Sequence, residues 1–100
     1  MKYIVKFTSQ FKKDYKKAQK QHKNIYVLKS VVNMLANGET LPIKYSDHIL
    51  IGDYKGKHEC HLEPDWLLIY EYDGDELILY LCRTGTHSDC LLYTSPSPRD

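Results

Sequence analysis

The hydrophobic pattern of this chain changes from a helical period to a period of two at His48, and this change constrains the fold more than any other feature. Before His48, apolar residues recur at helical spacing, with Leu28, Val31, Val32 and Leu35 as the clearest example. After it, apolar residues alternate with polar ones or form short apolar blocks, a pattern typical of strands. We therefore expect helices in the first half of the chain and a β-sheet in the second.

The predicted elements follow one another as a strand, two helices and four further strands. Thr8 or Ser9 can cap the first helix, and Gly38 can end the second. The helices are expected at about residues 9–22 and 24–37, the strands at 3–7, 48–51, 57–62, 66–72 and 76–82, a loop at 39–47, and turns at 52–56 and Asp73-Gly74.

The strands at 66–72 and 76–82 are apolar on both faces, so we expect them at the centre of the sheet, with helices covering at least one side. One hundred residues suffice for a single domain with one modest core. The expected fold class is α+β in β-α-α-β-β-β-β order, with the two N-terminal helices packed on a small, mainly antiparallel sheet.

The expected cellular compartment follows from the absence of a membrane span, a signal peptide and a disulfide framework in the sequence. No apolar run approaches the roughly 20 residues of a membrane span, and the first residues do not resemble a signal peptide, so we expect no membrane partner. Cys60, Cys82 and Cys90 show neither metal-site spacing nor a paired disulfide framework. A reducing cytoplasm fits these features.

Charge is divided sharply between the two halves of the chain. Residues 1–37 carry nine lysines against one aspartate, which gives +8, and residues 38–100 carry five basic against twelve acidic residues, which gives −7. This asymmetry indicates a polyanion-facing first half, and the alternative is a solvated helix face. The candidate RNA-contacting or ribosome-contacting residues are Lys12, Lys13, Lys16, Lys17, Lys20 and Lys23.

The second half carries an acid–base set made of His48, His61, Asp65, Arg83 and His87. Imidazoles that titrate near neutral pH, a carboxylate and a guanidinium are the groups that phosphodiester cleavage without a metal requires. Taken singly, each histidine could equally be structural or solvent-exposed. A catalytic role in RNA cleavage is favoured if the set converges, that is, if the separate elements that carry these residues end near one concave face.

Strand alternation ranks the histidines within residues 57–62. Cys60 and Leu62 share the face that must meet the core, and His58 falls on that side, whereas Glu59 and His61 point oppositely. His61 is therefore the better catalytic candidate, and His58 is expected to be a partly buried structural residue.

Asp65 and Trp66 can each be interpreted as functional or as structural residues. Asp65 and Trp66 follow Pro64 at a strand entrance, where a carboxylate can be held rigidly beside an aromatic, or where a turn simply precedes a core tryptophan.

Metal binding is disfavoured, because no H-E-x-x-H or C-x-x-C pattern is present and the positive charge of Arg83 would repel a metal cation. We expect no metal and no other cofactor.

Three sequence blocks carry a resemblance to a known family. They are Asp47-His48-x-Leu50-x-Gly52-x-Tyr54-Lys55-Gly56, then Glu59-Cys60-His61-Leu62-x-Pro64-Asp65-Trp66, then Arg83-Thr84-Gly85-Thr86-His87-Ser88-Asp89. Over residues 1–89 the chain resembles the YafQ branch of the RelE/ParE toxin superfamily. The resemblance implies a RelE-like fold and a type II toxin that inhibits translation as a ribosome-dependent mRNA endoribonuclease, leaving a 2′,3′-cyclic phosphate and a 5′-hydroxyl. The implied active site is His48, His61, Asp65, Arg83 and His87, with Trp66 supporting.

The resemblance also implies partners. These are the ribosome with its rRNA, mRNA, and a cognate antitoxin of ribbon-helix-helix type, with operator DNA bound only through the antitoxin complex. His87 would act as general acid and Arg83 would stabilise the transition state, whereas the base could be His48, His61 or Asp65. Two alternatives remain, a ParE-like gyrase-inhibiting toxin and a non-catalytic RNA-binding regulator, and neither needs the whole acid–base set.

The last residues depart from the family pattern, in which the His-Ser-Asp block ends with a leucine and an aromatic residue. Residues 90–100 instead look like an in-frame translation of a transposon-derived sequencing adapter. We expect a single toxin domain at residues 1–89 and a non-native, disordered tail at 90–100. The alternative is a genuine Ser-Pro tail, which would be equally unfolded.

Overall fold

The computed structural model describes residues 2–50 and 56–90. Its elements are β1 (Ile4–Phe7), α1 (Ser9–Lys20), α2 (Ile25–Ala36), a 3₁₀ turn η1 (Ile43–Tyr45), β2 (His48–Ile49), β3 (Lys57–Glu63), β4 (Trp66–Asp73) and β5 (Ile78–Gly85). This order confirms the predicted α+β class and the succession of strand, two helices and four strands.

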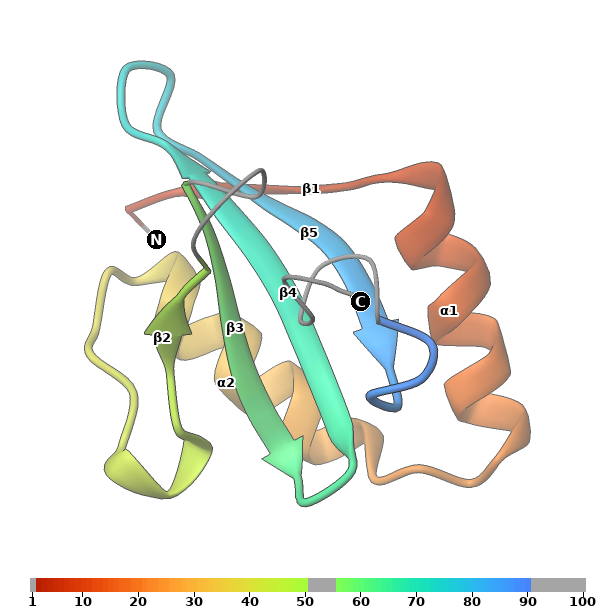
Figure 1. Ribbon diagram of the computed structural model, residues 1–100. Coiled ribbons are helices and arrows are strands. Elements are labelled where there is room, and N and C mark those ends of the chain that lie inside the picture. Colours follow the sequence, from red (N-terminus) through yellow and green to blue (C-terminus); the bar gives the residue numbers. More distant parts are fainter. Residues whose placement is uncertain (1, 51–55, 91–100) are drawn as a thin grey trace, which may run out of the picture.

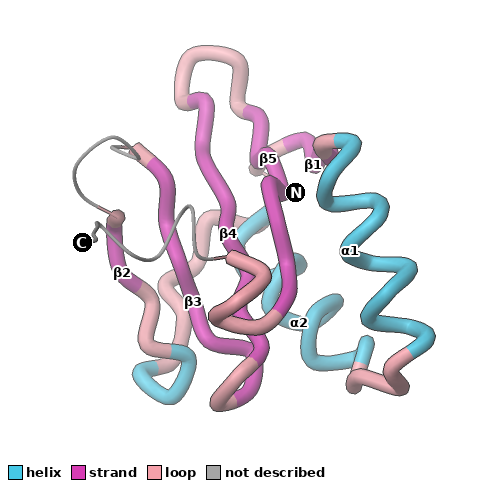
Figure 2. The backbone as a smooth tube through the Cα atoms, turned by 45° about the vertical axis from the view of Figure 1, so that its right-hand side comes forward, coloured by secondary structure: helices cyan, strands magenta, loops and turns pink. Residues whose placement is uncertain are grey.

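The five strands form one sheet in the order β1-β5-β4-β3-β2. The first strand pairs with β5 in parallel, and the other three pairings are antiparallel. Figure 1 shows α2 lying across one face of the sheet and α1 standing beside β5, and the tube in Figure 2 shows the same arrangement turned by 45°. The prediction that β4 and β5 lie inside the sheet is confirmed.

Apolar side chains fill both faces of the central strands. The larger cluster lies between the helices and the sheet and includes Val31 and Leu35 of α2 with Leu68 of β4. A smaller cluster occupies the opposite face, which we call the open face, and consists of Leu50, Leu67, Ile69, Cys82 and Cys90, with Tyr80 packed against it. The two clusters explain why β4 is apolar on both sides.

Several predicted boundaries shift, for local reasons. Thr8 caps α1 by accepting the N–H of Phe11, but the helix ends at Lys20, two residues early, because His22 turns the chain at φ 59°. Gly38 follows α2 at φ 78°, a conformation that favours glycine. The expected loop at 39–47 contains η1, and residues 51–55, which hold most of the predicted turn at 52–56, lie outside the described residues.

The last hairpin differs most from the prediction. Oδ1 of Asp73 accepts the N–H groups of Asp75 and Glu76, which widens the turn, so β5 begins at Ile78 instead of residue 76. At its other end β5 continues to Gly85, with an irregularity where Ile69 pairs with Arg83 and Tyr70 with Leu81. Arg83 therefore lies within the strand, which corrects the expectation that it follows the strand.

Cys90, assigned to the tail from the sequence, is fully buried in the open-face cluster, and its N–H donates to the carbonyl of Thr86. Residues 91–100, which make up the rest of the expected tail, lie outside the described residues. Within residues 2–50 and 56–90, no helix is long and apolar enough to cross a membrane.

Candidate active site

The open face of the sheet gathers the three histidines of the predicted acid–base set. His48 lies on β2, His61 on β3, and His87 follows β5. The imidazole centroids of His48 and His61 are 6.4 Å apart, and those of His61 and His87 are 5.4 Å apart, both edge to face. Residues separated by up to 39 positions in the chain thus form one row of imidazoles.

A buried carboxylate joins the first two histidines. Oε1 of Glu59 lies 3.1 Å from Nε2 of His48 and 3.5 Å from Nε2 of His61. Glu59 is only 5% exposed, whereas the side chain of His48 is half exposed. The backbone fixes this contact, because His48 and Glu59 are paired directly across antiparallel strands. The hydroxyl of Tyr70 donates to Asp47, which anchors the chain entering β2.

The third histidine has its own carboxylate. Oδ1 of Asp65 lies 2.7 Å from Nδ1 of His87 and also accepts the backbone N–H of His87 at 3.1 Å. These hydrogen bonds hold the pKa of Asp65 below its usual value, so the carboxylate is ionised at neutral pH. A carboxylate accepts hydrogen bonds, so Nδ1 carries a proton and Nε2 of His87 is the nitrogen left for a substrate.

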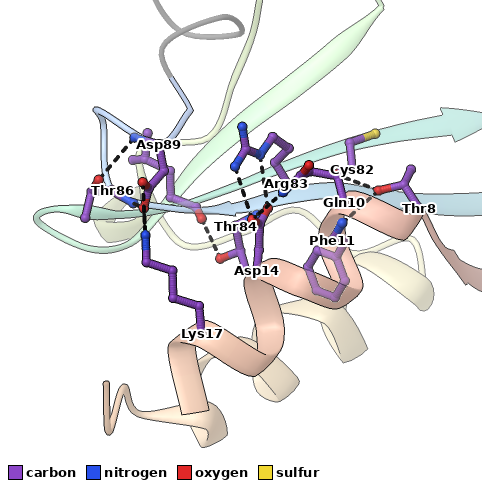
Figure 3. A network of polar contacts seen from close by, with 11 residues as sticks. Thr8, Gln10, Phe11, Asp14, Lys17, Cys82, Arg83, Thr84, Thr86 and Asp89 are labelled. Atoms are coloured by element: carbon purple, nitrogen blue, oxygen red, sulfur yellow. Dashed lines mark hydrogen bonds and ion pairs between the residues drawn. The ribbon is translucent and has the colours of Figure 1, made fainter. Parts of the chain in front are cut away.

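Arg83 is held from the side, by helix α1. Its Nε and Nη2 atoms donate to Oδ2 and Oδ1 of Asp14 at 3.0 and 3.1 Å, as Figure 3 shows. Oδ2 of Asp14 also accepts the backbone N–H of Thr84 at 3.1 Å. The hydrogen bonds with Asp14 raise the pKa of Arg83 above its usual value. The guanidinium is therefore a fixed cation with one edge already occupied.

The turn that carries His87 is tied to the same helix. Oδ2 of Asp89 accepts the N–H of Thr86 at 3.2 Å, and Nζ of Lys17 lies 3.3 Å from Oδ1 of Asp89 (Figure 3). Position 85 has room for glycine only, because a Cβ there would lie 2.8 Å from side-chain atoms of Asp89. Helix α1 thus contacts β5 through Asp14 and the turn after β5 through Lys17.

The remaining predicted residues fall into two groups. Trp66 is 1% exposed and packs in the cluster between the helices and the sheet. Any support that it gives to its neighbour Asp65 therefore comes from the buried side of the sheet. His58 is partly buried and stacks on Tyr70 at a centroid distance of 4.9 Å, consistent with the structural role expected for it. The lysines of α1 face solvent, and only Lys23, in the turn after the helix, is half-buried.

Two carboxylates of this site escaped the sequence analysis. Asp14 is the lone acidic residue among the nine lysines of residues 1–37, and it lies on the apolar side of its helix with Phe11 and Ala18, which is a usable signal. Glu59 was placed on the same strand face as His61, but nothing local indicated its burial or its contact with His48. Both are ion-pair partners of residues that were identified.

The acidic, histidine and cysteine side chains of the described residues were also compared with the spacing that a metal ion requires. No group of three or more His, Cys, Asp or Glu side chains within residues 2–50 and 56–90 is arranged to hold an ion. The three imidazoles each lie within ion-pair distance of a carboxylate, Glu59 for His48 and His61 and Asp65 for His87. Fold and geometry together define a small α+β protein with a cluster of histidines and carboxylates beside a basic helix.

Comparison with known proteins assigns the family. The family model described as bacterial toxin of type II toxin-antitoxin system, YafQ, matches residues 3–92. The mRNA interferase toxin YafQ of Escherichia coli K12 is 44% identical over 85 residues, spanning 84% of this chain and 90% of that protein. The chain belongs to the YafQ family of type II toxins.

Solved structures agree with this assignment. YafQ in the E. coli DinJ-YafQ complex superimposes with a TM-score of 0.80 at 41% identity, covering 87% of this chain and 96% of that one. A metal-bound toxin from Helicobacter pylori gives a TM-score of 0.83 at 39% identity, covering 87% and 97%. The RelE-like fold expected from the resemblance is confirmed.

Proposed function

We propose that this endoribonuclease inhibits translation by cutting mRNA on the ribosome, through acid–base catalysis that needs no metal. The observation that carries the proposal is the facing pair of His61 and His87, whose ring centroids are 5.4 Å apart, with the Glu59 carboxylate 3.5 Å from His61 and the Asp65 carboxylate 2.7 Å from His87. The curated relative is an mRNA interferase, which supports mRNA as the substrate. A pair of imidazoles at this spacing can place one nitrogen on each side of a phosphodiester.

His87 acts as the general acid in this proposal. Asp65 keeps the Nδ1 proton in place and stabilises the imidazolium, so Nε2 can deliver a proton to the departing 5′-oxygen. This use of Asp65 argues against its serving as the base, because its pKa is lowered and its Oδ1 already accepts two hydrogen bonds from His87. The expected product at this side is a 5′-hydroxyl.

His61 is then the favoured base, facing His87 across the scissile phosphate. It removes the proton of a ribose 2′-hydroxyl, which attacks the neighbouring phosphorus and forms a 2′,3′-cyclic phosphate. Charge builds up on the phosphate oxygens during this step. Arg83 stabilises that charge through Nη1, since Asp14 engages the Nε and Nη2 edge.

The exposed lysines of α1 grip phosphates of ribosomal RNA in this proposal. Phosphate contacts position a protein on nucleic acid without reading its sequence. Lys17 links this helix to the turn of His87 through Asp89, and the charge of Lys23 helps lower the pKa of Asp65, so the basic row borders the site. The protein would act in the cytoplasm, where the ribosomes are.

The proposed protein partner is a cognate antitoxin of ribbon-helix-helix type, and the solved E. coli DinJ-YafQ toxin-antitoxin complex supports an antitoxin as partner. A groove of about 1020 Å³ runs between α1 and α2, lined by apolar side chains such as Phe11, Leu28 and Val32, with Lys12 and Lys16 also lining it. An amphipathic helix with acidic flanks fits such a groove. Operator DNA would be bound only through the complex.

The decisive experiment compares cleavage of one mRNA on programmed ribosomes and free in solution. We expect cuts only on ribosomes, at an unchanged rate after the toxin alone has been stripped of metal. Equal cutting of naked RNA would remove the ribosome dependence, and loss of activity after stripping would remove the metal-free mechanism. Absence of any cleavage, with inhibition of gyrase instead, would favour the ParE-like alternative.

A further inference from the structure

The turn that follows β5 and carries His87 is closed by two reciprocal hydrogen bonds. Oδ2 of Asp89 accepts the backbone N–H of Thr86 at 3.2 Å, and Oγ1 of Thr86 accepts the backbone N–H of Asp89, also at 3.2 Å. The backbone N–H of Cys90 donates to the carbonyl oxygen of Thr86 at 3.0 Å. A reciprocal pair of this kind fixes one turn of chain, as a capping box does at the start of a helix. His87 lies inside the closed turn.

Asp89 also joins this turn to its surroundings. A Cβ at Gly85 would lie 2.8 Å from Oδ2 of Asp89, so the carboxylate lies directly against the last residue of β5. Nζ of Lys17 lies 3.3 Å from Oδ1 and 3.5 Å from Oδ2 of Asp89 (Figure 3). Partial burial acts to raise the pKa of Asp89, but the hydrogen bonds from Thr86 and Lys17 outweigh it and hold that pKa below its usual value. One ionised carboxylate therefore connects the turn, the end of β5 and helix α1.

The ion pair of His87 with Asp65 cannot hold this turn by itself. The two side chains are 51% and 67% exposed, and exposed ion pairs contribute little stability because water competes for both partners. The pair orients the imidazole, which lies edge to face with the ring of His61. Where that imidazole lies relative to His61 depends on the backbone of the turn, and Asp89 fixes that backbone.

We propose that Asp89 is a positioning residue for His87, because its carboxylate closes the turn with Thr86 and holds it on helix α1 through Lys17. A general acid must lie within hydrogen-bond reach of the oxygen that it protonates, and a displacement of about 1 Å can cost about 10²-fold in rate. Asp89 acts through the backbone, and the ring of His87 does the chemistry. This inference rests on the proposed nuclease function, in which His87 is the general acid.

The first test is Asp89→Ala in the full-length protein, measured as single-turnover cleavage of ribosome-bound mRNA. We expect a loss of about 10²-fold in rate, because the turn is no longer closed. In a His87→Ala background the same substitution should cost nothing further, since the group that Asp89 positions is already absent. Asp89→Asn keeps an acceptor oxygen for the N–H of Thr86 and should recover most of the lost rate.

The chain offers a matched control at the other end of β5. Oδ1 of Asp73 accepts the backbone N–H groups of Asp75 and Glu76, so this carboxylate also closes a turn beside the strand. Asp73→Ala should lower the thermal midpoint about as much as Asp89→Ala does, but it should keep the wild-type rate. The comparison separates the positioning of His87 from general support of the sheet.

A second measurement needs no activity. The hydrogen bonds from His87 hold the pKa of Asp65 below its usual value, so the titration of Asp65 reports whether His87 is in place. Carbon-13 NMR should show the pKa of Asp65 rising toward the ordinary value of 3.8 in Asp89→Ala and unchanged in Asp73→Ala. Loss of the Asp89 charge alone would act in the opposite direction, because a neighbouring negative charge raises the pKa of a carboxyl group.

Three results would overturn the inference: a wild-type rate in Asp89→Ala, a further loss of rate in the His87→Ala background, or an unchanged titration of Asp65. If Asp89→Ala does not fold, Thr86→Val replaces it. This variant removes the oxygen that accepts the N–H of Asp89, and it should shift the rate and the titration in the same directions. A wild-type protein that cuts no RNA would refute the nuclease proposal instead, and the titration would still decide the role of Asp89.

Discussion

Two ion pairs lie at the end of β5, and they differ in their access to water. The side chains of Arg83 and Asp14 are 17% and 7% exposed, whereas those of His87 and Asp65 are 51% and 67% exposed. The buried pair joins a helix to a strand and also satisfies a backbone N–H. The exposed pair joins two loops and leaves one imidazole nitrogen free. Burial suits a fixed charge, and exposure suits a group that must exchange protons.

Replacing the exposed imidazole tests the comparison most strongly. His87→Ala should lower the cleavage rate by about 10²–10⁴, the usual contribution of a general acid. The free energy of unfolding should hardly change, because the His87 side chain is half exposed. Single-turnover rates and urea unfolding measure the two quantities. A large loss of stability would mean that this pair is structural after all.

Breaking the buried pair should have the opposite signature. Asp14→Ala removes the partner of Arg83 and of the Thr84 N–H, and should lower the free energy of unfolding by about 3 kcal/mol. Lys17→Ala, which breaks the exposed contact with Asp89, is the control and should cost less than about 1 kcal/mol. Equal effects of the two substitutions in urea unfolding would erase the distinction between buried and exposed pairs.

The two sides of α1 extend the same comparison. Its Asp14 side is buried, and its lysine side faces solvent. Reversing Lys12, Lys13, Lys16 and Lys20 to Glu should weaken ribosome binding and flatten its salt dependence by about one unit of slope for each lost phosphate contact, leaving the cut sites unchanged. Binding measured across a salt series decides this. If the variant binds the ribosome as tightly as the wild type does, the lysines of α1 are only solvent-exposed residues without a role in binding.

Acid should distinguish the exposed pair by a smaller effect. The pKa of Asp65 is lowered by the hydrogen bonds from His87, so its contribution to stability is present above the ordinary Asp value of 3.8 and is lost as the pH falls through the lower folded value. Asp65→Asn should therefore reduce the loss of stability below that pH. Urea midpoints of both proteins on either side of pH 3.8 test this. Parallel curves would contradict it.

Local pattern sufficed for much of the molecule. Helical spacing at Leu28 to Leu35 and alternation at residues 57–62 depend on neighbouring residues alone, so the elements, the α+β class and the outward direction of His61 could be predicted. The motif blocks around Asp65 and His87 also carried the family. Boundaries failed where a single side chain redirected the chain, as Asp73 does in the last turn.

Contacts between distant residues lay beyond such reasoning. Thr84 and Asp14 are 70 positions apart, and their hydrogen bond depends on how α1 packs against β5. The burial of Cys90 depends on the segment after β5 folding onto the open face. Neither contact can be inferred from a periodic pattern in the sequence, because the residues that meet are far apart in the chain.

The sequence by itself determined the kind of elements, their order, the division of charge and the identity of the reactive side chains, since these follow from residue type and short-range spacing. Only the tertiary structure decided which carboxylate lies against which basic side chain. Asp14 belongs to Arg83, Asp65 to His87, and Glu59 to His48 and His61. The register of the strands and the packing of the helices bring the partners of these ion pairs together, and a charged side chain that is buried needs such a partner.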